Sequence, residues 1–285
     1  MRLSTIRLAD GGTTAAAGSG DGWCRLAAPD VGVLLAQPEW QTVAARRIDG
    51  AETSHWGSGA DLAPVVMSPR KVICCGHNYR AHIAEMGRGT PEFPTLFTKF
   101  ADTLTGPVDD IRVPEGASEL DWEAELAVVV GRPLRHADEA TATAAIAGYT
   151  IANDFSVRSW QHRTSQWLPG KAFDATTPLG PELVTPDEID PGDGLRLTCA
   201  VNGVVVQQGS TNDLLFSPAK LLAYISTFTR LDPGDLVLTG TPGGVGAGAK
   251  PPRYLNDGDV VETVIEGIGA LRNLIRTSTH IEKNS

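Results

Sequence analysis

Short apolar runs, separated by glycine and polar residues, recur along most of the chain. This pattern is typical of short strands joined by tight turns. A hairpin is predicted over residues 198–206, because Asn202-Gly203 supplies the two positive-φ positions of a type I′ turn. Further strands are predicted at residues 71–75, 120–126, 148–154, 235–238 and 259–265.

A few segments carry helix-start signals instead. Helices are predicted at residues 78–86, 138–147 and 217–228. Asn78 and Asp138 are candidate caps of the first two helices, and Pro218 suits the first position of the third. Strands outnumber helices without the alternation of a βα array, so the predicted fold class is β-rich α+β.

The first 68 residues differ from the rest of the chain. Polar, glycine-rich patches at residues 10–14 and 18–22 separate short apolar runs, which predicts short strands and hairpins. Pro69 marks the predicted boundary. The chain is therefore divided into a small N-terminal subdomain, residues 1–68, and a larger second domain, residues 69–285.

Composition and charge narrow the function classes. Hydrophobic residues make up 41% and charged residues 20% of the 285 residues, as in ordinary globular proteins. The net charge is −10, and because nucleic-acid binding depends on clustered Lys and Arg, no nucleic-acid partner is expected. No apolar run approaches the ~20 residues of a membrane span, and the first residues lack the apolar core of a secretory signal. A cytoplasmic protein without a membrane partner is expected.

The cysteines show no pattern of their own. Cys24, Cys74, Cys75 and Cys199 fit neither the spacing of a zinc site nor a disulfide framework. We predict that they are reduced, buried packing residues.

The predicted strand at 120–126 carries a row of acidic residues. Strand alternation places Asp121, Glu123 and Glu125 on one face. Carboxylates at i and i+2 lie roughly 7 Å apart, so the row repels itself and is costly to desolvate. The strand continues into valines at 128–130, which favours burial, and a hard divalent cation such as Mg²⁺ or Mn²⁺ would neutralise the carboxylates. A charged, solvated edge strand is the alternative.

Two further charged residues have open interpretations. Asp154 ends a predicted strand and either completes a three-carboxylate site or caps a helix over residues 157–163. Lys171 is a lone cation among glycine and apolar residues, and a surface lysine or a partner of Asp174 would explain it without a functional role.

His82 and Glu85 stand at i and i+3 on one face of a predicted helix. A carboxylate beside an imidazole raises its basicity and fixes its orientation, as in a water-activating base, although a solvated helix shows the same spacing. Residues 238–246 form a Gly- and Thr-rich turn whose amides and hydroxyls could hold a carboxylate. The turn lacks the lysine of a phosphate-binding loop, so nucleotide binding is not expected.

The order of these segments resembles that of the fumarylacetoacetate hydrolase superfamily, from about residue 70 to about residue 275. The resemblance is carried by Gly76-His77-Asn78-Tyr79-Arg80-Ala81-His82, Asp121-Trp122-Glu123-Ala124-Glu125-Leu126, Asn153-Asp154, Gly170-Lys171-Ala172-Phe173-Asp174 and Thr239-Gly240-Thr241-Pro242. It implies a mixed β-sandwich roll, with the family's smaller and variable domain at the N terminus, assembled as a homodimer.

The resemblance also implies roles for individual residues. The ligands of Mg²⁺ or Mn²⁺ would be Glu123, Glu125 and Asp154, whereas Asp121 belongs to the motif without being a ligand. The other implied roles are a lid-helix dyad of His82 and Glu85, an active-site Lys171, substrate contacts by Arg158 and Gln161, and carboxylate binding by Thr241.

The substrates implied by the resemblance are small 2-oxo acids. The first expectation is hydrolysis of an acylpyruvate-type 2,4-dioxo acid, such as fumarylpyruvate or acetylpyruvate, to pyruvate and a carboxylic acid. Water would be activated by His82 with Glu85, and the metal and Lys171 would stabilise the enolate. Oxaloacetate decarboxylation comes second, and 2-hydroxyhepta-2,4-diene-1,7-dioate isomerase or hydratase activity third. A non-catalytic binding protein is the alternative from another class, which the complete set of site residues disfavours.

Overall fold

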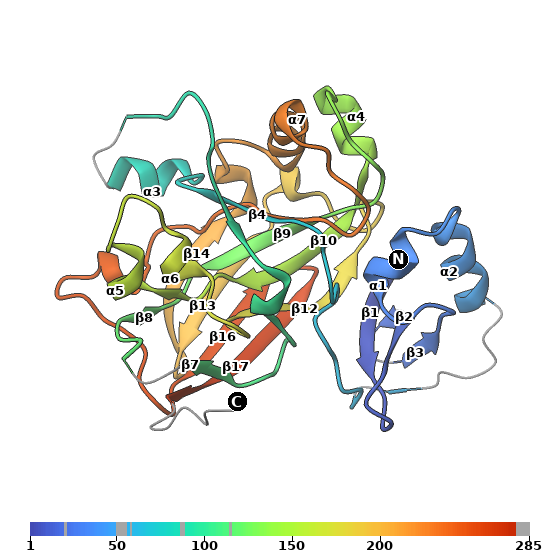
Figure 1. Cartoon of the computed structure of the whole chain (residues 1–285), viewed down its shortest axis with the longest axis horizontal. Helices are drawn as coiled ribbons and strands as arrows, with labels where there is room; N and C mark the ends of the chain where they lie inside the picture. The colour runs from blue at the N-terminus through green and yellow to red at the C-terminus, as the bar shows by residue number, and fades with distance from the viewer. Residues whose placement is uncertain (20–21, 50–55, 58, 86–88, 114–115, 278–285) are drawn as a thin grey trace.

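The structure is a computed structural model that describes residues 1–19, 22–49, 56–57, 59–85, 89–113 and 116–277. The side chains of residues 19, 47–49 and 85 are outside this description. Within the described residues the backbone forms a 10-stranded sheet, a 5-stranded sheet and a 2-stranded ribbon. This strand-rich arrangement confirms the predicted β-rich α+β class (Figure 1).

The large sheet has the strand order β3-β2-β1-β12-β10-β9-β15-β4-β5, with β6 beside β12. Its neighbours are antiparallel except for β15 with β4 and β12 with β6, which are parallel. The strands of this sheet are β1 (Arg2–Arg7), β2 (Thr13–Ser19), β3 (Gly22–Arg25), β4 (Val72–Gly76), β5 (Thr95–Lys99), β6 (Leu104–Thr105), β9 (Ala124–Val130), β10 (Ile146–Asn153), β12 (Thr177–Val184) and β15 (Leu236–Leu238).

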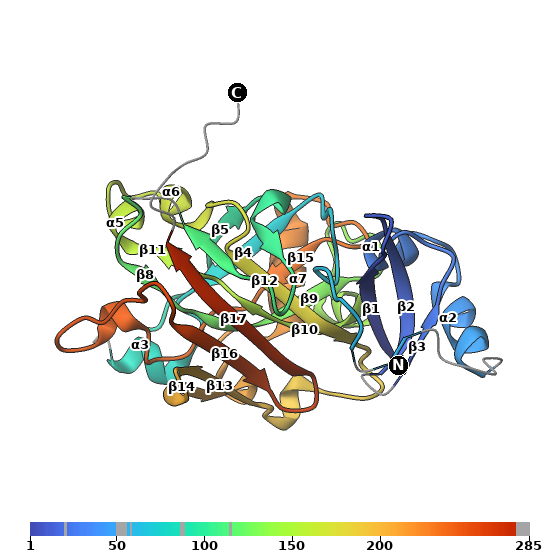
Figure 2. The same cartoon turned by 90° about the horizontal axis from the view of Figure 1, so that it is seen from below.

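The second sheet has the order β14-β13-β16-β17-β7 and packs against one face of the first (Figure 2). Its strands are β7 (Ile111–Val113), β13 (Arg196–Val201), β14 (Val204–Ser210), β16 (Val260–Ile265) and β17 (Gly269–Thr277), and the ribbon consists of β8 (Leu120–Asp121) and β11 (Ser156–Val157). The helices are α1 (Val31–Leu35), α2 (Trp40–Asp49), α3 (Arg80–Glu85), α4 (Glu139–Ala144), α5 (Arg158–Gln161), α6 (Leu168–Lys171) and α7 (Pro218–Phe228).

The strand β9 is buried along its whole length, because packed layers cover both faces of the large sheet. Leu126 and Val128 point into the core between the two sheets. Ala127 and Val129 point into a second core, which also contains Val31 of α1. A shift of one residue would exchange the two sets and move Glu125 to the other face of the sheet.

The first strands of the chain continue the large sheet. β1 pairs with β2 and also with β12, where Arg2 is opposite Val184 and Leu3 is opposite Leu183. The short strands predicted for this region are confirmed, and α1 and α2 are additional helices that were not predicted (Figure 1). The boundary at residue 69 stays a prediction.

Several predicted elements are confirmed with their local signals. Asn202 and Gly203 have φ values of 52° and 77° in the turn between β13 and β14. The Asp138 carboxylate accepts from the Thr141 N–H at the start of α4, and α7 begins at Pro218. The predicted strands at the positions of β4, β10, β15 and β16 are present.

Other predicted boundaries are wrong. Asn78 does not cap α3, because its side-chain amide bonds the backbone of Phe216 and Thr239, while the Asp213 carboxylate accepts from the Ala81 N–H at 3.0 Å. Asn78 therefore ties the start of α3 to two distant segments. The helix predicted to reach residue 147 ends at Ala144, because β10 begins two residues later.

The strand predicted over residues 120–126 is interrupted. β8 ends at Asp121 and β9 begins at Ala124. The row of acids is therefore not one continuous face, and Asp121 belongs to a separate ribbon with β11.

The four cysteines are buried and free, as predicted. Among the helices that the structure describes, none has the length and apolar character required to cross a lipid bilayer.

Candidate active site

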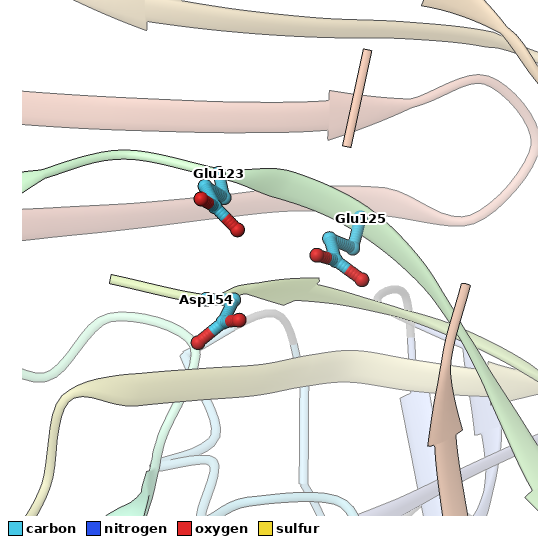
Figure 3. A group of neighbouring side chains, drawn as sticks. All are labelled: Glu123, Glu125 and Asp154. Carbon is cyan, nitrogen blue, oxygen red and sulfur yellow. The ribbon is translucent and has the colours of Figure 1, made fainter. Parts of the chain in front are cut away.

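Three buried carboxylates lie together near the ends of the two central strands of the large sheet. Glu123 directly precedes β9, Glu125 lies on β9, and Asp154 directly follows β10. These strands are antiparallel neighbours, and the Asp154 amide donates to the Glu123 carbonyl at 2.8 Å. One oxygen of each carboxylate lies within 4.8 Å of the others (Figure 3). The strand pairing thus brings together the three predicted metal ligands.

Two buried lysines contact this cluster. Lys171, at the end of α6, places Nζ 2.7 Å from Asp154 Oδ2 and 2.6 Å from Glu123 Oε2. Lys99, at the end of β5, places Nζ 2.6 Å from Asp154 Oδ1. Burial opposes ionisation of Asp154, but Lys171 and Lys99 outweigh it and hold the pKa of Asp154 below its usual value. Asp154 is therefore held as a carboxylate.

Glu125 has a different environment. Its Oε2 accepts from the Gly240 N–H at 2.6 Å, and no ion pair to Glu125 is found within the described part of the chain. Burial, and then the negative charges of Asp154 and Glu123, raise the pKa of Glu125 well above its usual value. A divalent cation would offset this repulsion, and carboxylate oxygens are the donors that Mg²⁺ and Mn²⁺ prefer. The residues present therefore fit such an ion.

Arg158 joins the carboxylate cluster to the loop after β15. Its Nη2 lies 2.7 Å from Glu123 Oε1, and its Nε donates to Asp121 Oδ2 at 2.9 Å. Its Nη1 donates to Gln161 Oε1 at 2.7 Å. The Asp121 carboxylate also accepts from three backbone N–H groups, those of Trp122, Gly246 and Ala247. Asp121 thus fixes both Arg158 and the loop.

A cavity of about 410 Å³ opens beside these groups. Its wall includes two of the three clustered carboxylates, Glu123 and Glu125, and the predicted functional residues His82, Arg158, Gln161, Lys171 and Thr241. Aromatic side chains form another part of the wall. The centre of the Trp167 ring lies 5.4 Å from the ring centres of Phe97 and His77, in edge-to-face contacts. The clustered carboxylate oxygens suit a metal ion, and the cations beside them suit a small organic anion.

Of the predicted pair on α3, His82 and Glu85, the structure describes the side chain of His82 only. His82 lines the cavity. The side chain of Glu85, and residues 86–88 after it, lie outside the described residues.

The open interpretations from the sequence are now decided. Asp154 is not a helix cap, because α5 begins only after Val157 and the Asp154 carboxylate contacts lysines. Lys171 is 1% exposed and forms ion pairs with Glu123 and Asp154, so it is not a surface lysine paired with Asp174. The acidic row is buried rather than solvated.

The glycine-rich turn holds a carboxylate of the protein itself. The Gly240 amide binds Glu125, and Thr241 Oγ1 accepts from Gln207 Nε2 at 2.8 Å. Gln207 Oε1 in turn accepts from the Ala124 N–H at 3.0 Å. The turn therefore orients a predicted metal ligand, and the Thr241 side chain faces the cavity.

Sequence reasoning missed Lys99 and the role of Asp121. Lys99 is 3% exposed. The signal that could have found it is a single lysine in a strand that is otherwise uncharged, between Phe97 and Phe100. Asp121 was expected to lie beside the other acids but instead binds backbone amides and Arg158.

The fold and the site define a class of β-rich protein that gathers three carboxylates, able to hold a metal ion, beside a cavity. Residues 71–276 match the family model described as the C-terminal part of fumarylacetoacetate hydrolase. The chain belongs to the fumarylacetoacetate hydrolase superfamily, and its relatives in this family are enzymes.

Individual relatives indicate the branch. The human protein "Oxaloacetate tautomerase FAHD2A, mitochondrial" is 46% identical over 216 residues, which is 75% of this chain and 68% of that protein. The structure of fumarylacetoacetate hydrolase from Exiguobacterium antarcticum has a TM-score of 0.85 and 32% identity. The structure of 2-hydroxyhepta-2,4-diene-1,7-dioate isomerase from Mycobacterium marinum has a TM-score of 0.78 and 33% identity. Each comparison with a structure covers 98% of this chain and 100% of the other chain, and together they confirm the predicted fold.

Proposed function

We propose that the protein is a divalent-metal-dependent isomerase that interconverts the enol and keto forms of a small 2-oxo acid. The observation that carries the proposal is that Glu123 and Glu125 of the carboxylate cluster line one cavity together with Lys171 and His82. Support also comes from relatives named oxaloacetate tautomerase and 1,7-dioate isomerase.

The charges of the site support binding of a cation and an anion together. Four buried carboxylates, including Asp121, face three buried cations, so the site has one negative charge in excess when all four carboxylates are ionised. A divalent cation reverses the sign of the site and makes it attractive for an acid anion. We propose Mg²⁺ or Mn²⁺ held by Glu123, Glu125 and Asp154, and a 2-oxo acid as the partner molecule.

The chemistry is a proton shift. The enol loses the proton of its C2 hydroxyl and gains a proton at C3, so no atom is gained or lost overall. The bound metal would act as a Lewis acid that stabilises the enolate. We assign proton transfer to His82, because an imidazole can both accept and donate a proton. Lys171 adds positive charge beside the same centre. We assign contacts with the carboxylate of the substrate to Arg158, Gln161 and Thr241, which line the cavity.

The test is the rate of ketonisation of enol oxaloacetate, followed by its ultraviolet absorbance. Protein stripped with chelator and then reloaded with Mg²⁺ or Mn²⁺ should accelerate the decay beyond the spontaneous rate, and the stripped protein should not. The proposal would be overturned if the metal-loaded protein gave the same rate as the spontaneous reaction, or the same rate as the stripped protein.

Hydrolysis of an acylpyruvate is the second candidate, supported by His82 at the cavity and by the likeness to a structure named fumarylacetoacetate hydrolase. It requires release of pyruvate and acetate from acetylpyruvate. Oxaloacetate decarboxylation requires release of CO₂, and both products are measurable in the same reactions.

Assembly and location are proposed from the family resemblance and the composition. We propose a homodimer with no nucleic-acid or membrane partner. A cytoplasmic location stays a prediction, since the human relative is named a mitochondrial protein.

A further inference from the structure

A second chamber adjoins the catalytic cavity. Its volume is about 360 Å³, and His82, Val245 and Gly248 line both spaces. Glu123, Glu125 and Lys171 line the first space only. A substrate whose 2-oxo acid end binds at the cluster therefore has room for the rest of its carbon chain in the second chamber.

Arg253 supplies the positive charge of the second chamber. Its guanidinium carbon lies 6.0 Å from the centre of the Trp122 ring, and both side chains line the chamber. Arg253 is exposed, and no ion pair to it is found among the residues that the structure describes. Its charge is therefore available to an anion that enters from the catalytic cavity.

The backbone of Arg253 is fixed relative to the catalytic cavity. Its N–H donates to the Gly246 carbonyl at 3.0 Å. The Gly246 N–H donates to Asp121 Oδ1 at 2.7 Å, and Asp121 Oδ2 accepts from Arg158 Nε. The buried carboxylate of Asp121 thus anchors Arg158, which lies beside the predicted metal ligands. It also anchors the segment that carries Arg253. Gly246 leaves no room for a side chain here, because an added Cβ would overlap the Arg253 carbonyl oxygen.

Trp122 provides an apolar surface of the second chamber. Its indole N–H donates to the Gly244 carbonyl at 3.1 Å, so its polar atom is already satisfied. Trp122 is only 2% exposed, so its ring adds a small apolar surface beside the Arg253 guanidinium. The other chamber residues include Val206, Val245 and Ala249, which carry no charge.

We propose that Arg253 binds the distal carboxylate of an extended dicarboxylic 2-oxo acid and thereby selects substrates longer than oxaloacetate. The proposal rests on the proposed function, because it requires that the 2-oxo acid end of the substrate binds at the carboxylate cluster. Arg253 is in this view a specificity-determining residue.

The test uses two compounds that differ only at the far end. One is 2-hydroxyhepta-2,4-diene-1,7-dioate, and the other carries a carboxamide in place of the C7 carboxylate. Arg253→Gln should lower kcat/KM for the dioate about ten-fold, through KM, because a charge-assisted hydrogen bond is lost at a partly solvated site. The same variant should leave the carboxamide unaffected, and Arg253→Lys should restore part of the loss. The matched control is Arg112→Gln, which changes an exposed arginine of β7 that contacts Asp110.

The outcomes separate the two proposals. An equal effect of Arg253→Gln on both compounds, or no effect on either, overturns the role of Arg253. The proposed isomerase function is tested separately by the ketonisation of enol oxaloacetate. If the wild-type protein converts neither C7 compound, Arg253 is tested by calorimetric titration of the Mg²⁺-loaded protein. About ten-fold weaker binding of the dioate alone supports Arg253 in that case, and equal affinities of variant and wild type overturn it.

Discussion

The substitution Asp121→Asn tests whether one buried carboxylate supports both the active-site arginine and the loop beside it. Asp121 is fully buried, and each of its two oxygens accepts two hydrogen bonds. Asparagine keeps one acceptor oxygen and replaces the other with an NH₂ group, which would face two donors. The substitution also removes the charge that faces Arg158.

The magnitude follows from these contacts. Two buried donors left without an acceptor cost about 1–3 kcal/mol each. Removing one partner of a buried ion pair costs about 3–5 kcal/mol, and this figure overlaps with the first, because one of the donors belongs to Arg158. Since Arg158 keeps its contact with Glu123, we expect a total loss of about 3–5 kcal/mol in the free energy of unfolding. This is a large part of the about 5–15 kcal/mol that stabilises an ordinary domain.

The assay is urea unfolding of the metal-free protein, followed by circular dichroism. The expected result is a lower midpoint at unchanged slope. The control is Asp110→Asn, because Asp110 lies at the surface and pairs with Arg112 at 3.3 Å, and exposed pairs contribute about 0–1 kcal/mol. A loss below about 1 kcal/mol for Asp121→Asn would refute the reasoning.

Three further predictions concern the site and the response to acid. Glu123→Gln removes a charged ligand, so calorimetry should show Mg²⁺ affinity reduced more than about ten-fold, since even outer-shell partners of metal ligands contribute that much; unchanged affinity would contradict the ligand assignment. His82→Ala should lower kcat by about 10²–10⁴, as for loss of a general acid–base, and should keep Mg²⁺ affinity; a parallel loss of metal would show a different role. Burial opposes ionisation of Asp109, but hydrogen bonds, first that from Arg7, lower its pKa, so its charge stabilises the fold above the usual aspartate pKa and this contribution fades as the pH falls. The difference in urea midpoint between wild type and Asp109→Asn should therefore shrink on acidification, and a growing difference would refute this.

The candidate site was largely predictable where the signal is local. Glu123 and Glu125 share one strand end, and the order of segments along the chain placed Asp154 and Lys171 with them. Burial then decided between the open alternatives, because Lys171 is 1% exposed. No single-sequence pattern contains this burial, since it depends on how the strands are ordered in the sheet.

The residues that were missed depend on contacts between distant segments. Lys99 reaches Asp154 because β5 and β10 belong to the same large sheet. The cap of α3 comes from Asp213, which lies 132 residues from the amide that it binds. Asn78, the local candidate for this cap, bonds instead to backbone groups 138 and 161 residues away.

The pairing of β1 with β12 has a consequence for attempts to shorten the protein. If the first 68 residues were removed, β12 would become an open sheet edge along the segment that now pairs with Arg2 and Leu3. Unpaired backbone groups beside a buried apolar face such as Leu183 offer a template for strands of other chains. A catalytic fragment cut at the predicted boundary is therefore expected to aggregate, even though every clustered carboxylate lies beyond the cut. The N-terminal strands thus protect solubility as much as they extend the fold.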